Sequence, residues 1–203
     1  MCVFDFVGDK IFLKKVMNEL DNFVCSIMPI IEKFFRYVIV GGYVSILFGR
    51  TRTTEDIDVI VDPRGVSLKK MRIFYTNLEE GGFWVFNAPK FKVGYEYLQN
   101  GLAIRIAKKD MIIPNIEFKC AKEQLDFETL DNRLVVHLND CRVYISPLEI
   151  CIAYKFYLGS QKDIEDAVHL FCIFQDKINK KKIQSYLIQL GIDLEEVMAI
   201  LRC

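Results

Sequence analysis

The sequence predicts an α/β (α+β) protein with a mixed sheet core, flanking helices and a C-terminal helical part. Two β-branched runs, at residues 37–40 and 57–61, each end at turn residues, as strands do. Elsewhere apolar residues recur at three- and four-residue intervals, which is the period of helices. From Ser146 onward the pattern is wholly helical. We therefore expect a sheet core with an N-terminal helix at residues 1–145 and a C-terminal helical part at residues 146–203 that packs on it.

The composition is that of a globular protein without a charge bias. Of 203 residues, 52% are apolar, and 27 basic residues balance 27 acidic ones. Disordered chains combine low hydrophobicity with high net charge, so wholesale disorder is excluded. A net charge of zero gives no overall attraction to nucleic acid or anionic membranes, so a phosphate-bearing ligand needs a local site. The longest uncharged stretch, residues 37–49, is too short to span a bilayer, and we expect no membrane partner.

The N-terminus and the cysteines favour a cytoplasmic location. The first residues lack the basic leader and long apolar run of a signal peptide. The seven cysteines are odd in number, scattered and never spaced as C-x-x-C. We therefore expect reduced and mostly buried thiols. The cysteines are Cys2, Cys25, Cys120, Cys141, Cys151, Cys172 and Cys203.

The individual elements follow from periodicity and turn residues. Residues 10–35 have helical spacing, and we expect Pro29 to kink or divide that helix. The first strand runs into Gly41-Gly42, and Gly49 ends the short helix that follows. The further elements expected are helices at 43–48 and 67–78, extended stretches at 102–107 and 112–119, a hairpin of 134–138 with 142–145 around Asn139-Asp140, and helices at 147–158, 163–174, 180–190 and from 194 onward.

Two aspartates at the start of the second strand are the most informative residues. Asp56 and Asp58 lie two positions apart, so their side chains share one face of the strand, while Ile57 and Val59 take the other. Neighbouring carboxylates repel each other unless a cation lies between them. A divalent cation with oxygen ligands is the usual solution, and we expect Mg²⁺ at Asp56 and Asp58.

The glycine turn before this strand points to a phosphate-bearing ligand. Gly41 and Gly42 open a short helix, where backbone N–H groups can approach an anion closely. A phosphate site beside a metal site is what transfer of a nucleotidyl group from an NTP needs. The further donors expected at this site are Ser45, Arg52, Thr53 and Thr54.

These side chains also have purely structural interpretations, which the sequence leaves open. The aspartates can be solvated charges at the start of a strand, and the hydroxyls can bond to nearby backbone. Lys155 lies on an apolar helix face, where it either extends to solvent or contacts the phosphates. Asp163 lies in the first turn of its helix, where acids interact favourably with the helix dipole.

Two motifs carry a resemblance to a known family. The glycine turn followed by the Asp-x-Asp strand resembles the signature of the nucleotidyltransferase superfamily related to DNA polymerase beta. Residues 147–155, followed by Lys162-Asp163-Ile164-Glu165-Asp166, resemble AbiEii-type nucleotidyltransferase toxins and their uncharacterised relatives. The resemblance implies a nucleotidyltransferase-like core that transfers an NMP from an NTP, with Mg²⁺, to a hydroxyl of an RNA (tRNA) or protein acceptor. It also implies Lys155 and Asp163 in the nucleotide site, and an antitoxin protein as the partner of a toxin.

The third acid departs from the superfamily pattern. The superfamily has an acid, more often aspartate, on a later strand, and here Glu117 takes that place. Asp110, just outside an extended run, is a less suitable candidate. The resemblance thus implies Asp56, Asp58 and Glu117 as the catalytic and metal-binding carboxylates. The alternative is a non-catalytic module of the same fold that binds a nucleotide or a partner protein.

Overall fold

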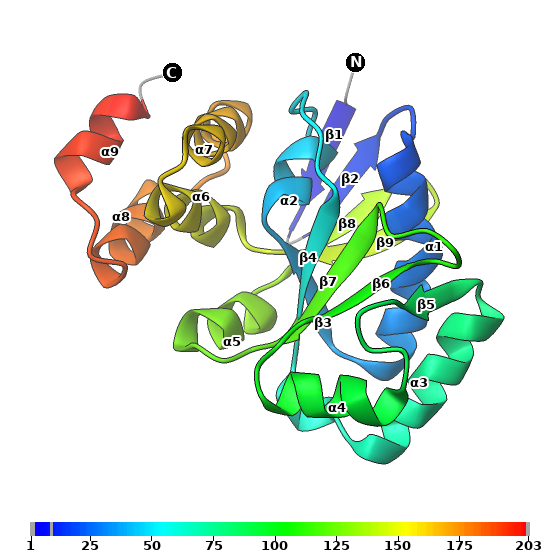
Figure 1. Ribbon diagram of the computed structural model, residues 1–203. Helices are drawn as coiled ribbons and strands as arrows, with labels where there is room; N and C mark the ends of the chain where they lie inside the picture. Colours follow the sequence, from blue (N-terminus) through cyan, green and yellow to red (C-terminus); the bar gives the residue numbers. More distant parts are fainter. Residues whose placement is uncertain (1–2, 9, 202–203) are drawn as a thin grey trace.

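A nine-stranded mixed sheet forms the centre of the computed structural model, which describes residues 3–8 and 10–201 (Figure 1). Its strands are β1 (Val3–Val7), β2 (Lys10–Lys14), β3 (Tyr37–Val40), β4 (Asp56–Val61), β5 (Phe83–Val85), β6 (Ile104–Lys108), β7 (Asn115–Cys120), β8 (Leu134–Leu138) and β9 (Cys141–Ile145). Hydrogen-bonded neighbours follow the order β1-β2-β8-β9-β3-β4-β7-β6-β5. The pairs β2–β8, β3–β9 and β4–β7 are parallel and the others antiparallel, so the predicted mixed sheet is confirmed.

Helices flank the sheet and continue beyond it. They are α1 (Glu19–Phe34), α2 (Gly42–Leu47), α3 (Leu68–Glu80), α4 (Phe91–Gln99), α5 (Gln124–Asp131), α6 (Leu148–Leu158), α7 (Gln161–Phe174), α8 (Lys180–Gln189) and α9 (Leu194–Ile200), with a 3₁₀ turn at Pro63–Gly65. In Figure 1, α1 lies behind β5 and β6, α3 lies at the lower right beside α4, and α6 to α9 stand to one side. The C-terminal helices predicted from the sequence are therefore present. No helix in the described ranges is both long and apolar enough to cross a bilayer.

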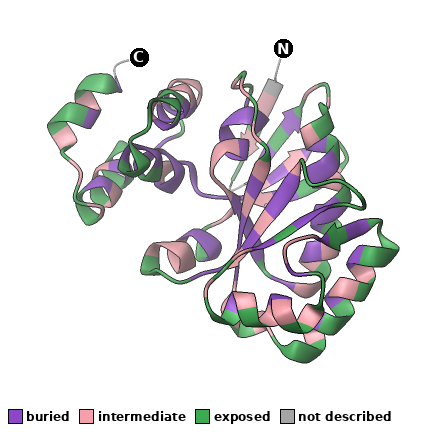
Figure 2. Ribbon diagram, viewed as in Figure 1, coloured by how far each residue is buried: buried purple, intermediate pink, exposed green. Residues whose placement is uncertain are grey.

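The two faces of the central strands differ in chemistry. Along β4, Ile57, Val59 and Val61 are fully buried, whereas Asp56 and Asp58 are half-buried. The buried side chains belong to the main core together with residues of α1 and α3 (Figure 2). Because successive side chains of a strand alternate, the carboxylates face the opposite side of the sheet from α1.

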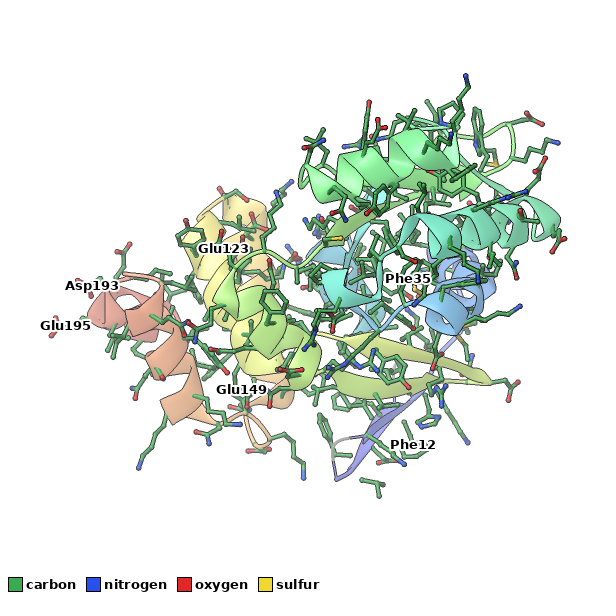
Figure 3. The ribbon with its side chains drawn as sticks, turned by 90° about the horizontal axis from the view of Figure 1, so that it is seen from below. Phe12, Phe35, Glu123, Glu149, Asp193 and Glu195 are labelled. Carbon is green, nitrogen blue, oxygen red and sulfur yellow. A yellow bond between two sulfur atoms is a disulfide. The ribbon has the colours of Figure 1, made fainter. Side chains whose placement is uncertain are left out.

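Aromatic side chains fill the core and fasten the C-terminal helices to it. Phe35, labelled in Figure 3, follows directly after α1. Its ring lies 5.1 Å from that of Phe74 on α3. Elsewhere, the ring of Phe174 on α7 lies 4.8 Å from Phe4 on β1 and 4.7 Å from Phe48 after α2. Such ring pairs add to the burial of large apolar surfaces. The Phe174 contacts therefore attach α7 to the N-terminal strands and to α2.

The first predicted helix was wrong in its N-terminal part. Residues 10–14 form β2, in which Ile11 and Leu13 are buried and their neighbours exposed. This alternation of buried and exposed side chains covers only five residues. In the sequence it could not be distinguished from the helical spacing of the residues that follow. Helix α1 begins after Asn18, whose side chain accepts a hydrogen bond from a first-turn N–H at 2.7 Å. Pro29 lies within α1 and does not divide it.

Most other elements agree with the sequence prediction within a few residues. The predicted β3, β4, β8–β9 hairpin, α2, α3 and α6 to α9 are confirmed. The sequence pattern did not predict β5 and α5, which have only three and eight residues and give little periodic signal. It also missed α4, which has Gly94 in its middle, a poor helix former. A Cβ at Gly94 would overlap the Tyr75 hydroxyl, so this glycine lets α4 pack closely on α3.

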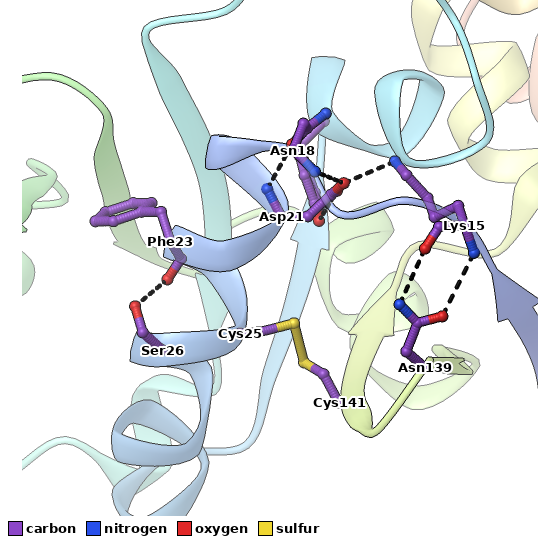
Figure 4. The surroundings of a disulfide bond; sticks show 9 residues. Lys15, Asn18, Asp21, Phe23, Cys25, Ser26, Asn139 and Cys141 are labelled. Carbon is purple, nitrogen blue, oxygen red and sulfur yellow. Dashed lines mark hydrogen bonds and ion pairs between the residues drawn. A yellow bond between two sulfur atoms is a disulfide. The ribbon is translucent and has the colours of Figure 1, made fainter.

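A disulfide bond joins α1 to the sheet. Cys25 on α1 is bonded to Cys141, the first residue of β9, with 5.8 Å between their Cα atoms (Figure 4). The prediction of reduced thiols was therefore wrong for this pair, and the cysteine-based argument for a cytoplasmic location no longer holds. The two residues are 116 positions apart, and only the fold brings them together.

The other cysteines have different settings. Cys120 and Cys151 are free thiols and buried, as predicted. Burial raises the pKa of each thiol to about 11, which keeps both protonated near neutral pH. Cys172 is disulfide-bonded, so the prediction of a reduced thiol was wrong for it as well. Cys2 and Cys203 lie outside the described residues.

Removing the disulfide should destabilise the fold. The double variant Cys25→Ser, Cys141→Ser is expected to lose about 2–4 kcal/mol of unfolding free energy, because a cross-link over a long loop restricts the unfolded chain. Denaturant unfolding under oxidising conditions measures the difference. Both proteins under reducing conditions are the control, and their midpoints should then nearly coincide. Equal midpoints for oxidised wild type and variant would contradict a stabilising bond.

Candidate functional site

Asp56 and Asp58 occupy the start of β4, on the sheet face opposite α1. In the parallel pairing of β4 with β7, Asp56 lies beside Asn115 and Asp58 beside Glu117. Residues paired across neighbouring strands project from the same face, so Glu117 lies next to Asp58. The Thr54 hydroxyl donates a hydrogen bond to a carboxylate oxygen of Asp56 at 3.3 Å. The three carboxylates singled out from the sequence thus share one face of the sheet.

The two glycines of the predicted turn each make room for a different side chain. Gly41 has a φ of +71°, and an added Cβ would lie 2.5 Å from Oδ2 of Asp58. At Gly42, an added Cβ would overlap the guanidinium of Arg52. The glycine turn therefore lies beside the Asp-x-Asp strand, as predicted. The space above its backbone is occupied by a carboxylate and a guanidinium.

Lys119 is a site residue that the sequence analysis missed. It follows Glu117 by two positions on β7 and so shares its face, which is the signal that could have found it. Its Nζ lies 3.0 Å from Oδ1 of Asp58 and 3.9 Å from Oε1 of Glu117. Burial alone would lower the pKa of Lys119, but the two carboxylates outweigh burial and the pKa is raised. The ammonium therefore stays charged between the two acids at neutral pH.

Two of the three carboxylates suit a magnesium ion, whereas the third is paired with an arginine. Oε2 of Glu117 accepts a hydrogen bond from Arg105 at 3.1 Å. Asp110, the other candidate, is exposed in the turn after β6. In the part of the chain that the structure describes, no three acidic, histidine or cysteine side chains gather closely enough to hold a metal. Mg²⁺ often takes only one or two protein carboxylates and completes its octahedron with water and phosphate oxygens, so the two aspartates fit it.

A cavity of about 350 Å³ opens between this face of the sheet and the C-terminal helices. The sheet contributes Asp58 and Lys119 to its lining, and α6 contributes Tyr154 and Lys155. The start of α5 forms a further wall with Asp126 and its neighbours. Small-molecule sites are typically concave and of this size or larger. The C-terminal helical part thus completes the cavity next to the aspartates.

A buried ion-pair network ties the C-terminal helices to the loop before β4. Asp166 on α7 is fully buried, and its Oδ2 lies 2.7 Å from Nζ of Lys155 and 3.1 Å from a guanidinium nitrogen of Arg52. Arg50 lies 3.6 Å from the other carboxylate oxygen and also pairs with Glu165. Lys155, 2% exposed, therefore ends on a carboxylate and does not extend to solvent. Two residues assigned to the nucleotide site from the sequence, Lys155 and Arg52, are held by Asp166.

The remaining residues assigned from the sequence have different surroundings. Ser45 is fully buried on α2, and its Oγ has no hydrogen-bond partner among the described residues. Thr53 is exposed in the loop before β4. Asp163 is largely buried at the start of α7, where one carboxylate oxygen lies 3.8 Å from Nζ of Lys155. None of Ser45, Thr53 and Asp163 lines the cavity, and their part in nucleotide binding stays a prediction.

The fold is similar to that of a solved structure. The crystal structure of an antigenic nucleotidyltransferase-like protein from Paracoccidioides brasiliensis matches with a TM-score of 0.52, covering 88% of this chain and 90% of that chain. This chain has a nucleotidyltransferase-like fold. At 16% sequence identity, the similarity concerns the fold alone. No family model and no curated protein matches the sequence, so the narrower resemblance to AbiEii-type toxins stays a prediction.

Removing the charge of Asp166 should destabilise this nucleotidyltransferase-like fold. Asp166→Asn leaves Lys155 and Arg52 buried without their carboxylate, and breaking a buried ion pair costs about 3–5 kcal/mol. Glu165→Gln, which breaks a more exposed pair on the same helix, is the matched control and should cost less than about 1 kcal/mol. Urea unfolding measures both variants. Indistinguishable midpoints would show that the network does not hold the helices in place.

Proposed function

We propose that this protein is a Mg²⁺-dependent nucleotidyltransferase that moves an NMP from an NTP to a hydroxyl of an RNA (tRNA) or protein acceptor. One observation carries the proposal: Asp56 and Asp58 share one face of β4, and Asp58 lines a cavity that α6 closes from the other side. The similarity to the fold of a nucleotidyltransferase-like protein supports it. The NTP would enter the cavity with its triphosphate toward the aspartates.

The side chains at and beside the cavity would take separate roles in the transfer of the NMP. Asp56 and Asp58 would hold Mg²⁺, which when bound supplies positive charge to the phosphoryl oxygens. Arg52, packed on Gly42 and paired with Asp166, would offer the remaining N–H groups of its guanidinium to the phosphates. Glu117, beside Asp58, would complete the site and accept the proton of the attacking hydroxyl as pyrophosphate leaves.

The role of a toxin in a toxin–antitoxin pair is proposed from the sequence resemblance alone. Such a toxin would act in the cytoplasm on tRNA or on a protein, and an antitoxin protein would restrain it. An antitoxin that acts by blocking the nucleotide would have to reach the cavity between β4 and α6. Co-expression with candidate neighbouring genes, scored by rescue of growth, tests this role separately from the chemistry.

A second candidate function, a non-catalytic module that binds nucleotide or protein, is favoured by Lys119. Its ammonium lies 3.0 Å from Asp58 and neutralises a carboxylate that a transferase would use for metal. Arg105 likewise pairs with Glu117. A module of this kind would bind NTP through the cavity without turnover. The two predictions that follow separate it from the enzyme.

Loss of either aspartate should abolish transfer. Asp56→Ala or Asp58→Ala is expected to lower label transfer from an α-labelled NTP by at least about 100-fold, because each 1.4 kcal/mol of lost transition-state stabilisation costs about tenfold. Asp131→Ala, which removes an exposed acid paired with Arg36, is the matched control and should keep wild-type transfer. The readout is transfer in total RNA or cell lysate with Mg²⁺ and each NTP in turn. Full transfer by an Asp56→Ala, Asp58→Ala double variant would refute the mechanism.

Replacing Lys119 should strengthen Mg²⁺ binding. Lys119→Met removes the ammonium that competes with the cation for Asp58, so half-maximal thermal stabilisation by Mg²⁺ should need about fivefold less of the ion, corresponding to about 1 kcal/mol for a partly exposed ion pair. Lys122→Met, an exposed lysine at the same cavity, is the control and should titrate like wild type. If neither wild type nor Lys119→Met responds to Mg²⁺, the non-catalytic module is the better account.

A further inference from the structure

A second cavity, of about 650 Å³, lies at the β5 edge of the sheet. It opens between α3, β5, the start of α4 and the turn after β6. Its lining includes two acids, Glu79 and Asp110, and a larger number of cations. The cations are Arg72, Lys90, Lys92 and Lys109. Within the described ranges none of these four forms an ion pair, so the cavity has positive charge available for a ligand.

Trp84 forms part of the wall with a ring that is fixed and partly open to solvent. It is the single tryptophan of the sequence, and its side chain is 36% exposed. Its Nε1 donates a hydrogen bond to the Met111 carbonyl at 2.8 Å, and its ring lies 6.2 Å from that of Phe86. Single-stranded nucleic acids bind where such aromatic faces stand beside cations, because bases stack on the rings and phosphates follow the charges.

The sheet register connects this edge with the aspartates of β4. Trp84 pairs with Ala107, Ala107 with Asn115, and Asn115 with Asp56. Their side chains therefore project from the same face, in a row that crosses three strand spacings of about 4.8 Å, or roughly 14 Å. In Figure 1 no helix passes in front of β4, β7 and β6. Ala107 and Asn115 within this row are buried, and Met111 and Ile112 of the turn after β6 accept hydrogen bonds from Trp84 and Asn115. A strand bound at Trp84 would therefore pass over this turn to reach Asp56.

We propose that the cationic cavity and Trp84 bind single-stranded RNA and direct its free end toward Asp56 and Asp58. This inference rests on the proposed function, because it assigns RNA as the acceptor. The phosphates would follow the four cations, and a base would stack on Trp84. An acidic peptide would meet the cations equally well but would need an aromatic side chain at the right position to stack on Trp84, whereas every nucleotide carries a flat base. The observations therefore favour RNA over a protein acceptor.

Intrinsic fluorescence gives a direct test, because Trp84 is the sole tryptophan. A short single-stranded RNA should quench its emission in a saturable titration, measured in EDTA and without NTP. An RNA duplex of the same sequence and polyglutamate should quench little. Because no transfer is needed, a quench without later transfer would uphold the RNA site while the enzymatic proposal fails.

Matched charge variants show whether the cations of this cavity take part. Lys90→Ala, Lys109→Ala should bind the RNA at least about fivefold more weakly, and the slope of log affinity against log salt should flatten by about 1.4, at about 0.7 per lost phosphate contact on a single strand. Lys181→Ala, Lys182→Ala removes two exposed lysines of α8 and should bind like wild type. Melting temperature controls for folding.

Three outcomes would overturn the proposal. They are absence of quenching by single-stranded RNA, equal weakening in the two double-lysine variants, and tighter binding of polyglutamate than of RNA. The last outcome would assign the surface to a protein acceptor. A Trp84→Ala variant, followed by anisotropy of labelled RNA, should bind at least about fivefold more weakly if a base stacks on the ring.

Discussion

The buried carboxylate of Asp166 is the interaction on which the arrangement of the molecule depends. A charge without water is costly unless opposite charges and hydrogen bonds compensate for it. Here the compensation comes from Lys155 of the neighbouring helix and from Arg52 of the loop before β4. Moving α7 away from that loop would separate Asp166 from Arg52 and leave the buried carboxylate with fewer compensating charges. The position of the helical wall relative to the aspartates of β4 therefore follows from one cluster of charges, supported by the aromatic contacts of Phe174.

The acids near the cavity differ in how far they are already neutralised. Asp58 has Lys119 and Glu117 has Arg105, each at about 3 Å. Asp56 forms no ion pair within the described ranges and accepts only the Thr54 hydroxyl there. A metal cation could therefore bind Asp56 directly. To bind Asp58 as well, it would have to displace the ammonium of Lys119. The protein balances charge internally when no ligand is present, which limits the repulsion that adjacent carboxylates would otherwise cause.

The sequence predicted what depends on local pattern and missed what depends on register between distant segments. Alternation was enough to place Asp56 and Asp58 on one face, and the turn residues were enough to end β3 at the glycines. Lys119 contacts Asp58 only because β7 pairs with β4, and the two residues are 61 positions apart. Cys25 and Cys141 likewise come together only in the folded chain. For Lys155, the sequence left a choice between solvent and phosphate. In the structure, Lys155 instead pairs with the buried Asp166 on the next helix. Helical periodicity places Lys155 on an apolar face but does not indicate this partner.

The adjacent glycines impose two separate steric requirements, although the sequence presents them as one motif. Gly41 accommodates the carboxylate of Asp58, whereas Gly42 accommodates the guanidinium of Arg52 and, through it, the contact to α7. Gly41 thus makes room for a carboxylate of the proposed metal site, and Gly42 makes room for the arginine that holds α7 in place. The backbone at Gly41, with φ +71° and ψ −146°, lies in a region that only glycine adopts readily, so position 41 would stay glycine even in a lineage that gave up the carboxylate. Loss of the activity would then be recorded at position 58, in a protein that kept both glycines and its shape.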